Sequence, residues 1–368
     1  MFDSKNLKKI TMTFSLISSK LIRVVFLWSL VLGTIASSCS KDDAPPAVVA
    51  DKTTLNAKIA LSQTAHDETV EGSKPGQYEA GSKAALTAAL TAAKAVSSDP
   101  AATQAQVNNA AANLQAALDA YLSHLIKEIA AENLIGFWKM NGNANDSSGN
   151  GNDGVITTGA AYYGGGTLTP TADRFGRAGM AYFFDKGANI EVPYTTSLNP
   201  SEITISLWSK KSSVVRALNA DTYTLVSLNR WNGYKLQYQS ANKIFMTVKA
   251  VNGTDTAYYD RDDEVAVLDN DVWYHVVVTF KPGTMNFYLD GDLVKSWTNT
   301  PNPPITLASP INFIIGQDLP TDKYLDVDGD FQVAWGGFFT GDIDDVMFYN
   351  IALDGPQVKS INTNQKTL

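Results

Sequence analysis

The chain has 368 residues, of which 44% are hydrophobic and 18% are charged. A chain of this length and composition can bury enough apolar surface for two or three folded units, so an intrinsically disordered protein is excluded. Its formal net charge of −8 repels phosphate backbones, and nucleic acid is therefore not an expected partner.

The first 38 residues have the pattern of a secretory signal. An apolar stretch over residues 24–36 follows the basic residues Lys20 and Arg23 and precedes several small residues. This order is typical of a cleaved signal peptide, and the apolar stretch is too short for a membrane-spanning helix.

Cys39 is the only cysteine in the sequence and has no partner for an intramolecular disulfide. The segment "ASSC" resembles the lipobox of bacterial lipoproteins, with Ala36 where that motif usually has Leu, and "SKDD" resembles the export tag of Bacteroidota surface lipoproteins. The resemblance implies a lipoprotein signal peptide over residues 1–38 and lipidation of Cys39. It also implies a tether over residues 39–50 and attachment to the outer membrane, facing the cell exterior.

Residues 51–130 are Ala-rich and are predicted to form three helices. Leu55 and Ile59 indicate the first helix, and "KPGQY" breaks the chain before the second. Thr103 with Gln106 as a capping box, or Asp99 with Pro100, begins the third. Its apolar residues recur at helical spacing, at Val107, Ala111, Leu114, Leu118, Tyr121, Leu122 and Leu125. Each apolar stripe needs another helix to cover it, which favours a three-helix bundle.

The segments "GQYEAGSKAALTAALTAAKAV" and "ATQAQVNNAAANLQAALDAYL" resemble the FIVAR domains of bacterial surface proteins. The resemblance implies that this bundle is mainly a spacer. His66 and His124 are expected to pack or to lie at the surface, because neither has an acid or a cysteine at the spacing of metal ligands.

From residue 133 to residue 368 the sequence consists of short alternating runs separated by Gly, Asn, Asp and Pro. In "ITISLW", Ile203, Ile205 and Leu207 point to one side, and "WYHVVVTF" alternates in the same way. The pair Asp290 and Gly291 is a strong hairpin signal. Many short strands with such turns predict an all-β sandwich.

The blocks "LIGFWKMNGNANDSSGNGNDG", "ITISLWSKK", "WYHVVVTFKPGTMNFYLDGDLV" and "FFTGDIDDVMFYNIAL" resemble, in this order, those of the laminin-G-like, concanavalin A-like family. The resemblance implies a mainly β fold, a two-sheet antiparallel jelly-roll sandwich, behind the N-terminal three-helix bundle. It also implies carbohydrate binding in many members, and an adhesive or structural role in others.

Catalysis needs carboxylates that the sequence does not offer in the usual pattern. The β-glucanases of this fold place two glutamates on one strand, in a Glu-x-Asp-x-x-Glu motif, at the retaining separation of roughly 5 to 5.5 Å. After Glu132 the chain has only Glu191, Glu202 and Glu264, and none lies in such a motif. We therefore predict no catalytic residues. An aspartate pair could replace the glutamates, so a glycoside hydrolase stays the alternative.

Two acids point to a metal ion. If "GDIDDVMFY" is a regular strand, Asp344 shares a face with Val346 and Phe348, while Asp345 lies on the other face and is solvated. In jelly-roll relatives the aspartate that matches Asp344 is commonly a calcium ligand, and Asp146 in "NDSSGNGNDG" resembles the loop that completes the site. The resemblance implies a structural calcium at Asp146 and Asp344. The alternative is that Asp146 caps a turn and Asp344 accepts backbone hydrogen bonds.

Sugar binding requires flat apolar rings that stack on sugar C–H faces and polar groups that orient hydroxyls. Five aromatic residues in loop-like segments fit this requirement: Trp231, Tyr234, Tyr258, Tyr259 and Trp335. The alternative for each ring is packing against the core. We expect a non-catalytic, surface-tethered lipoprotein that captures polysaccharide, with partner proteins of a glycan-uptake system, and a glycoside hydrolase or an adhesive module as alternatives.

Overall fold

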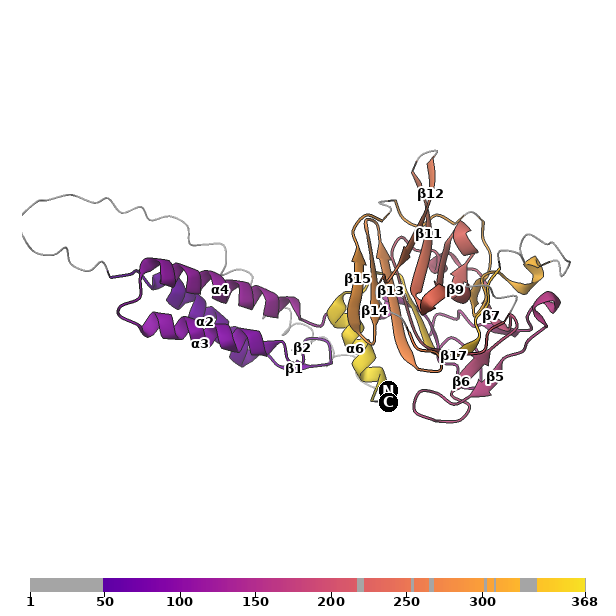
Figure 1. Cartoon of the computed structure of the whole chain (residues 1–368), viewed down its shortest axis with the longest axis horizontal. Coiled ribbons are helices and arrows are strands. Elements are labelled where there is room, and N and C mark those ends of the chain that lie inside the picture. Colours follow the sequence, from indigo (N-terminus) through magenta and orange to yellow (C-terminus); the bar gives the residue numbers. More distant parts are fainter. Residues whose placement is uncertain are drawn as a thin grey trace, which may run out of the picture. The chain divides into compact units, whose positions relative to one another are not determined.

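The structure is a computed structural model, and it describes residues 49–216, 222–252, 255–264, 268–300, 303–307, 309–324 and 336–367. Three helices come first in the chain, and Figure 1 shows them side by side: α2 (Thr53–Glu68), α3 (Lys83–Ser98) and α4 (Gln104–Ser123). Two short parallel strands, β1 (Glu71–Gly72) and β2 (Tyr78–Glu79), lie between α2 and α3.

The helices form the predicted three-helix bundle. Helix α4 begins at Thr103, whose side chain accepts a hydrogen bond from the Gln106 backbone in a complete capping box. Five residues of the predicted stripe are buried in α4, Leu122 and Leu125 are partly buried, and the core includes Leu55, Leu86, Leu114, Leu118 and Tyr121. The ring of Tyr121 stacks on Tyr78 at a centroid distance of 4.4 Å. Apolar periodicity, together with the chain break and the capping signals, therefore predicted this bundle.

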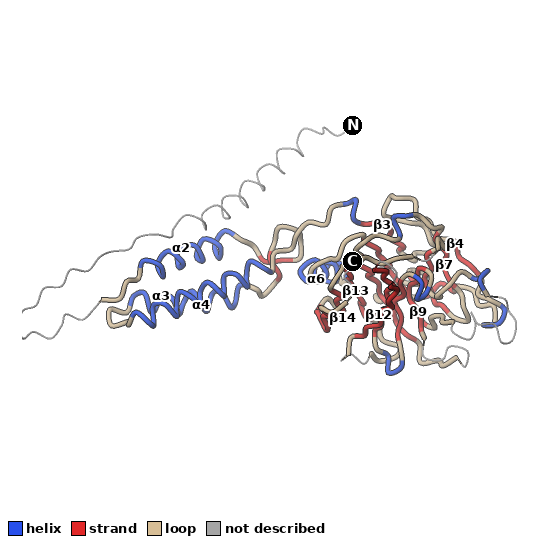
Figure 2. Tube along the Cα trace, turned by 90° about the horizontal axis from the view of Figure 1, so that it is seen from above, coloured by secondary structure: helices blue, strands red, loops and turns tan. Residues whose placement is uncertain are grey.

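The rest of the described chain is a sandwich of two antiparallel sheets (Figure 2). The seven-stranded sheet contains, from edge to edge, β12 (Asp255–Asp262), β11 (Ile244–Asn252), β10 (Tyr234–Tyr238), β9 (Tyr223–Leu228), β16 (Phe313–Ile315), β7 (Asn189–Val192) and β4 (Val155–Thr157). The eight-stranded sheet contains β15 (Asp292–Trp297), β14 (Thr284–Leu289), β13 (Tyr274–Lys281), β8 (Ile203–Lys211), β17 (Gly341–Tyr349), β6 (Ala181–Phe184) and β5 (Thr169–Thr171), with β3 (Leu134–Trp138) paired to β17.

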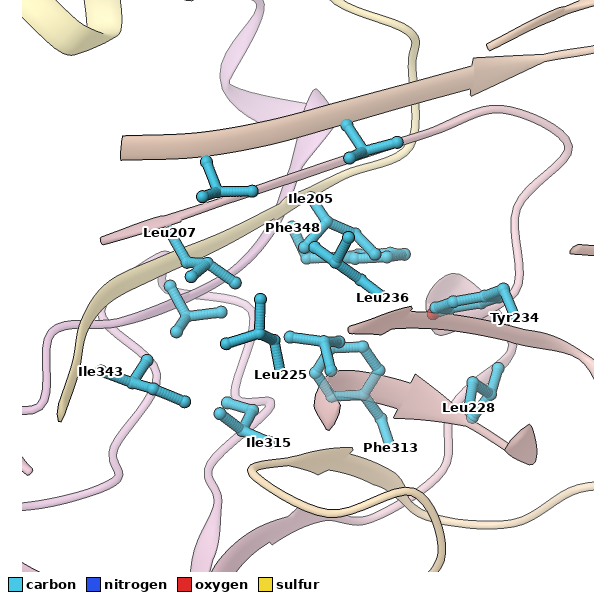
Figure 3. Close-up of a cluster of buried hydrophobic side chains, with 14 of the residues drawn as sticks. Ile205, Leu207, Leu225, Leu228, Tyr234, Leu236, Phe313, Ile315, Ile343 and Phe348 are labelled. Atoms are coloured by element: carbon cyan, nitrogen blue, oxygen red, sulfur yellow. The ribbon is translucent and has the colours of Figure 1, made fainter. Parts of the chain in front are cut away.

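The inner faces of the two sheets share one hydrophobic core. Ile205 and Leu207 of β8 and Tyr234 and Leu236 of β10 belong to this core, part of which Figure 3 shows. The alternation predicted for "ITISLW" is confirmed, because Trp208 faces away from this core. The hairpin predicted at Asp290 and Gly291 joins β14 to β15, and both residues have the positive φ that its turn requires. The mainly β, two-sheet fold is therefore confirmed.

Strand β17 contains a β-bulge that the sequence did not reveal. Its register against β8 shifts between Asp344 and Met347, and Asp345 has a φ of +46°. A bulge inserts one residue and reverses the alternation beyond it. Val346 and Phe348 consequently face the core, whereas Asp344 does not share their face. The prediction that these three side chains point in the same direction was wrong.

A C-terminal helix, α6 (Gly355–Gln365), was not predicted. Asp354 and Gln357 form its capping box, with a proline in the first turn. Val358 of this helix packs with Val277 and Tyr288, which lie on the outer face of the eight-stranded sheet. Helix α6 therefore covers part of that face. Within the described residues, every helix is too short or too polar to cross a lipid bilayer.

Candidate functional site

Trp231 lies in a short 3-10 turn, η4 (Arg230–Asn232), which joins β9 to β10. The turn is held in place because the backbone N–H of Arg230 donates to Ser227 Oγ at 2.9 Å. Asn229 and Arg230 both have positive φ, which turns the chain sharply between the two strands. The Arg230 guanidinium lies 4.8 Å from the centre of the Trp231 ring, and the half-buried indole is thereby fixed.

Arg230 is itself buried and paired. Its Nε lies 2.6 Å from Oδ2 of Asp318, and the hydroxyl of Tyr324 donates to the same carboxylate. Burial raises the pKa of Tyr324 well above its usual value, so this hydroxyl stays a donor at neutral pH. The Arg230 and Asp318 charges cancel, and the pair provides a rigid support for Trp231.

A row of polar residues crosses strands β12, β11, β10 and β9 beside this turn. Lys235 pairs in register with Thr247 on one side and with Ser227 on the other, and Thr247 pairs with Asp260. We call Asp260, Thr247, Lys235 and Ser227 the polar row. Because their strand neighbours Tyr234 and Leu236 lie in the core, these four side chains face outward.

Lys235 is the most constrained member of the polar row. It is only 7% exposed, and its Nζ lies 5.9 Å from the centre of the Trp231 ring. Burial lowers the pKa of this ammonium, and the carboxylates of Asp318 and Asp260 oppose that shift. Thr247 is also occupied, since its hydroxyl donates to Asp260 Oδ1 at 2.8 Å.

A second pair of polar side chains lies next to the polar row, two residues further along β10. Gln237 of β10 pairs in register with Thr224 of β9, and both are buried on the face opposite the core. Gln237 Oε1 and Thr224 Oγ1 have no hydrogen-bond partner within the part of the chain that the structure describes. Such unsatisfied atoms are rare in native proteins and often mark a place where water or a ligand supplies the partner.

Tyr258 extends the same face toward the sheet edge. It lies on β12 opposite Lys249 of β11, and it is 49% exposed. The outer face of β9 to β12 thus combines Trp231 and Tyr258 with an ammonium, a carboxylate and an amide. Rings of this kind stack on apolar surfaces, and the polar groups orient hydroxyls, which is the composition of a small-ligand or sugar-binding surface.

The structure separates the other predicted sugar-binding residues from this face. Tyr234 is 0% exposed, its hydroxyl donates to Leu198 O at 2.7 Å, and its ring lies in the core (Figure 3). Assigning Tyr234 to a binding site was wrong, because β10 begins at this residue and turns it inward. Tyr259 is half-buried and packs against the same core. Trp335 lies outside the described residues.

Asp146 is saturated by donors of its own loop. Its Oδ1 accepts from the backbone N–H groups of Phe137 at 2.9 Å and Ser148 at 2.8 Å. Its Oδ2 accepts from the Ser148 hydroxyl at 2.8 Å and from the Asn152 backbone at 3.0 Å. This is the turn-capping alternative, and these contacts lower the pKa of Asp146 in spite of its partial burial.

Asp344 and Asp345 share one cation. Arg174 Nη1 lies 2.6 Å from Asp344 Oδ2, and Arg174 Nη2 lies 2.9 Å from Asp345 Oδ2. The Asp345 side chain is only 14% exposed, so the expectation that it is solvated was wrong. Burial, together with the adjacent Asp345 carboxylate, raises the pKa of Asp344 to about 8, although Arg174 opposes the rise.

These contacts do not fit a calcium ion at Asp146 and Asp344. Calcium requires six to eight oxygen ligands, whereas both carboxylate oxygens of Asp146 and Oδ2 of Asp344 already accept protein hydrogen bonds. The described residues also contain no group of three or more His, Cys, Asp or Glu that could hold a metal ion. We therefore assign Asp146 to its loop and Asp344 to the Arg174 ion pair.

One serine and histidine pair resembles a catalytic arrangement but lacks its requirements. Ser206 Oγ lies 2.9 Å from His275 Nε2, and both side chains are completely buried. Burial lowers the pKa of His275 to about 3, and its Nδ1 has no partner among the described residues, so no carboxylate orients the ring. Its ring stacks on Trp208, so this histidine packs beneath the surface of the sheet.

The sequence did not reveal the polar row. Lys235 and Gln237 alternate with Tyr234, Leu236 and Tyr238 in "YKLQY", and this alternation is the signal that places them outward. The contact between Arg230 and Asp318 joins residues far apart in the chain, and periodicity carries no information about it.

Residues 184–359 match a family model described as the concanavalin A-like lectin/glucanases superfamily, and residues 51–121 match the FIVAR domain. The sandwich of two antiparallel sheets is consistent with a concanavalin A-like fold. Both matches support the domain content that the sequence blocks indicated, with a FIVAR domain ahead of a concanavalin A-like domain.

The chain is similar to individual proteins over limited stretches. A gellan lyase from Bacillus sp is 46% identical over 81 residues, which are 22% of this chain and 3% of that protein. One similar solved structure is domain 4 of the arabinanase AbnA from Geobacillus stearothermophilus in complex with arabinotriose. Its sequence identity to this chain is 19% and its TM-score is 0.45, and the match covers 62% of this chain and 98% of the AbnA chain. The binding domain of botulinum neurotoxin DC in complex with SialylT has 14% identity and a TM-score of 0.42, over 63% of this chain and 51% of its own.

Proposed function

We propose that this protein binds polysaccharide without cleaving it, on the outer face of strands β9 to β12. The observation that carries the proposal is the position of Trp231, an indole fixed by Arg230 beside the polar row. The match of residues 184–359 to a lectin and glucanase superfamily supports a carbohydrate ligand. The donor and acceptor groups of Lys235, Thr247 and Asp260 then orient the sugar hydroxyls.

The absence of cleavage is part of the proposal. Glu191, the glutamate nearest in register to the polar row, accepts from the Thr321 backbone at 3.0 Å and from Asn312 at 3.1 Å. Its oxygens are therefore engaged in holding a loop. Glycoside hydrolysis needs two carboxylates that face one substrate bond, and sugar capture by stacking needs none.

Affinity at such a face is modest and gains from multivalency. A stacked ring contributes on the order of 1 kcal/mol beyond its buried area, so one or two rings give weak binding per site. A polysaccharide that meets many copies on a surface is retained by avidity. This agrees with lipidation at Cys39, a spacer of three helices and a position on the outer membrane facing the exterior, which we propose together with the binding role.

Affinity electrophoresis of the full chain tests this proposal. Gels that contain arabinan, xyloglucan, galactan, polygalacturonate or κ-carrageenan are compared with a gel without polymer. We expect retardation by at least one polymer, and its loss in Trp231→Ala with an unchanged melting temperature. Trp273→Ala is the matched control, because Trp273 is also half-buried but stacks with Lys210 of the other sheet, at 5.4 Å.

The same samples test the alternative function. Incubation of the protein with the polymer that retards it should release no reducing ends and no unsaturated products. Turnover that disappears when a single Asp or Glu is changed would establish an enzyme instead. Equal retardation of the wild type and Trp231→Ala would show that binding, if it occurs, uses another surface.

A further inference from the structure

The charges on the outer face of β9 to β12 are unbalanced. Asp318 is neutralised by Arg230 at 2.6 Å. Lys235 forms neither an ion pair nor a hydrogen bond through its ammonium with any group in the described ranges, although it is 93% buried. A buried ammonium without a counter-charge is costly, and proteins usually pair it.

The nearest other acid does not balance this ammonium. Asp260 lies two strands away from Lys235, which places it at roughly 10 Å, and it accepts the Thr247 hydroxyl. A second cation, Lys249, lies two residues after Thr247 on β11 and therefore on the same face of the sheet. It too forms no ion pair with any described residue. Counted over the described residues, this face therefore carries excess positive charge in a protein whose net charge is −8.

We propose that the glycan bound at this face is acidic, with its anionic group, a carboxylate or a sulfate ester, held by Lys235. The proposal rests on the proposed function, because it names the ligand class of the same site. A ring stacked on Trp231 brings the substituent of that sugar, or of its neighbour, within reach of Nζ, which lies 5.9 Å from the indole centre. The anion supplies the counter-charge that the described residues do not supply.

The neighbouring row agrees with this assignment. Gln237 Oε1 is an acceptor and Thr224 Oγ1 can donate or accept, and both lack partners within the described part of the chain. Gln237 lies two residues beyond Lys235 on β10, on the same face. An acidic sugar offers an anion to the ammonium, whereas the almost completely buried Gln237 and Thr224 contribute only to the polarity around Lys235. A neutral sugar leaves the charge of Lys235 uncompensated.

The experiment measures binding of the full chain to polygalacturonate and to the same polymer after chemical reduction of its carboxyl groups. Binding to κ-carrageenan tests a sulfate in place of the carboxylate, and arabinan is the neutral polymer. We expect polygalacturonate or κ-carrageenan to bind at least about tenfold more tightly than the two neutral polymers, since a charge-assisted hydrogen bond is worth this factor or more. The preference should decrease as salt increases from low to physiological concentration.

Three variants test whether Lys235 is the residue that binds the anionic group of the glycan. Lys235→Met, which keeps the length of the side chain, should lose about tenfold in affinity for the acidic polymer, and Lys235→Arg should retain most of it. Lys281→Met is the control, because Lys281 is exposed on β13 of the other sheet, and it should bind as the wild type does. Melting curves of all three variants establish that they fold.

The outcomes separate the two proposals. Tight binding of arabinan or of the carboxyl-reduced polymer, lost in Trp231→Ala and kept in Lys235→Met, would overturn the acidic ligand and leave the sugar-binding function standing. Retardation by none of the polymers would contradict the binding function and the acidic ligand together. An acidic preference that Lys281→Met weakens as much as Lys235→Met does would show a general charge effect and would overturn the assignment to Lys235.

Discussion

Arg174 holds Asp344 through a 2.6 Å contact between Nη1 and Oδ2, and the same guanidinium lies 4.6 Å from the centre of the Trp208 ring. Both partners of the ion pair are almost completely buried. A buried pair of this kind adds little net stability, but the removal of one partner leaves an uncompensated charge. Asp344 pairs in register with Trp208 directly before the bulge in β17, so Arg174 holds the strand at the point where its register shifts.

The first prediction follows from this pair. Arg174→Met should lower the free energy of unfolding by about 3 to 5 kcal/mol at pH 9, where Asp344 is ionised, because its buried carboxylate and that of Asp345 then lack a cation. Urea denaturation measures the change. Lys323→Met is the control, since its pair with Asp322 is exposed and should contribute at most about 1 kcal/mol. Equal effects of the two substitutions would contradict the buried ion pair.

The second prediction concerns pH. The folded pKa of Asp344 is raised from 3.8 to about 8, so the folded state binds a proton between these values that the unfolded chain has released. The contribution of this group to stability therefore falls as the pH rises from about 4 to about 8. Asp344→Asn should flatten the dependence of the unfolding free energy on pH over this range. A variant with the same slope as the wild type would show that other groups cause it.

The third prediction concerns metal. Because Asp146 and Asp344 are occupied by protein donors, EDTA should leave the melting temperature of the wild type unchanged. Asp146→Ala should cost at least about 2 kcal/mol, because it removes the acceptor of four hydrogen bonds. A fall in the melting temperature of the wild type on chelation, reversed by added calcium, would instead support the calcium site that the sequence suggested.

The fourth prediction distinguishes two tyrosines. Tyr234→Ala should destabilise the protein by about 3 to 5 kcal/mol, since the ring fills the core. Tyr234→Phe should cost about 1 kcal/mol, the value of its bond to Leu198. Tyr258→Ala should change stability little, because the ring is half exposed. Thermal unfolding of the three variants checks this order, and a large effect at Tyr258 would place its ring in the core.

The fifth prediction concerns the proposed anchor. Cys39→Ser removes the thiol that receives the lipid, so the protein should leave the membrane fraction or remain unprocessed. Fractionation of cells that express the wild type and the variant, with detergent as a control, measures this. A processed variant that still requires detergent for release would contradict lipidation at Cys39.

Much of the fold was predictable because alternation and capping are local signals. Ile203, Ile205 and Leu207 indicated their strand, and Thr103 with Gln106 marked the start of α4. The bulge at Asp345 was not predictable, because one inserted residue leaves the strand composition unchanged and only its pairing reveals the shift. Helix α6 was missed because Asp354, Gly355 and Pro356 also fit a turn.

The candidate site was less predictable than the fold. Trp231 was found because its loop is marked by Asn and Gly, but Tyr234 was assigned to the same loop although β10 begins there. Lys235 gains its significance because no described residue forms an ion pair with it, which depends on contacts across three strands. Arg230 and Asp318 are 88 positions apart, and such a pairing is a property of the folded sheet.

The edge strands of the two sheets affect whether copies of this protein aggregate when they are crowded together. An open sheet edge invites strand addition from another molecule and so promotes aggregation. Strand β12, the longest edge, carries Asp260, Arg261 and Asp262, and β15 carries Asp292 and Lys295. The other two edges, β4 and β5, have three residues each, and Pro170 lies in the middle of β5. Charge, shortness and proline thus protect the sandwich against polymerisation when it is densely displayed.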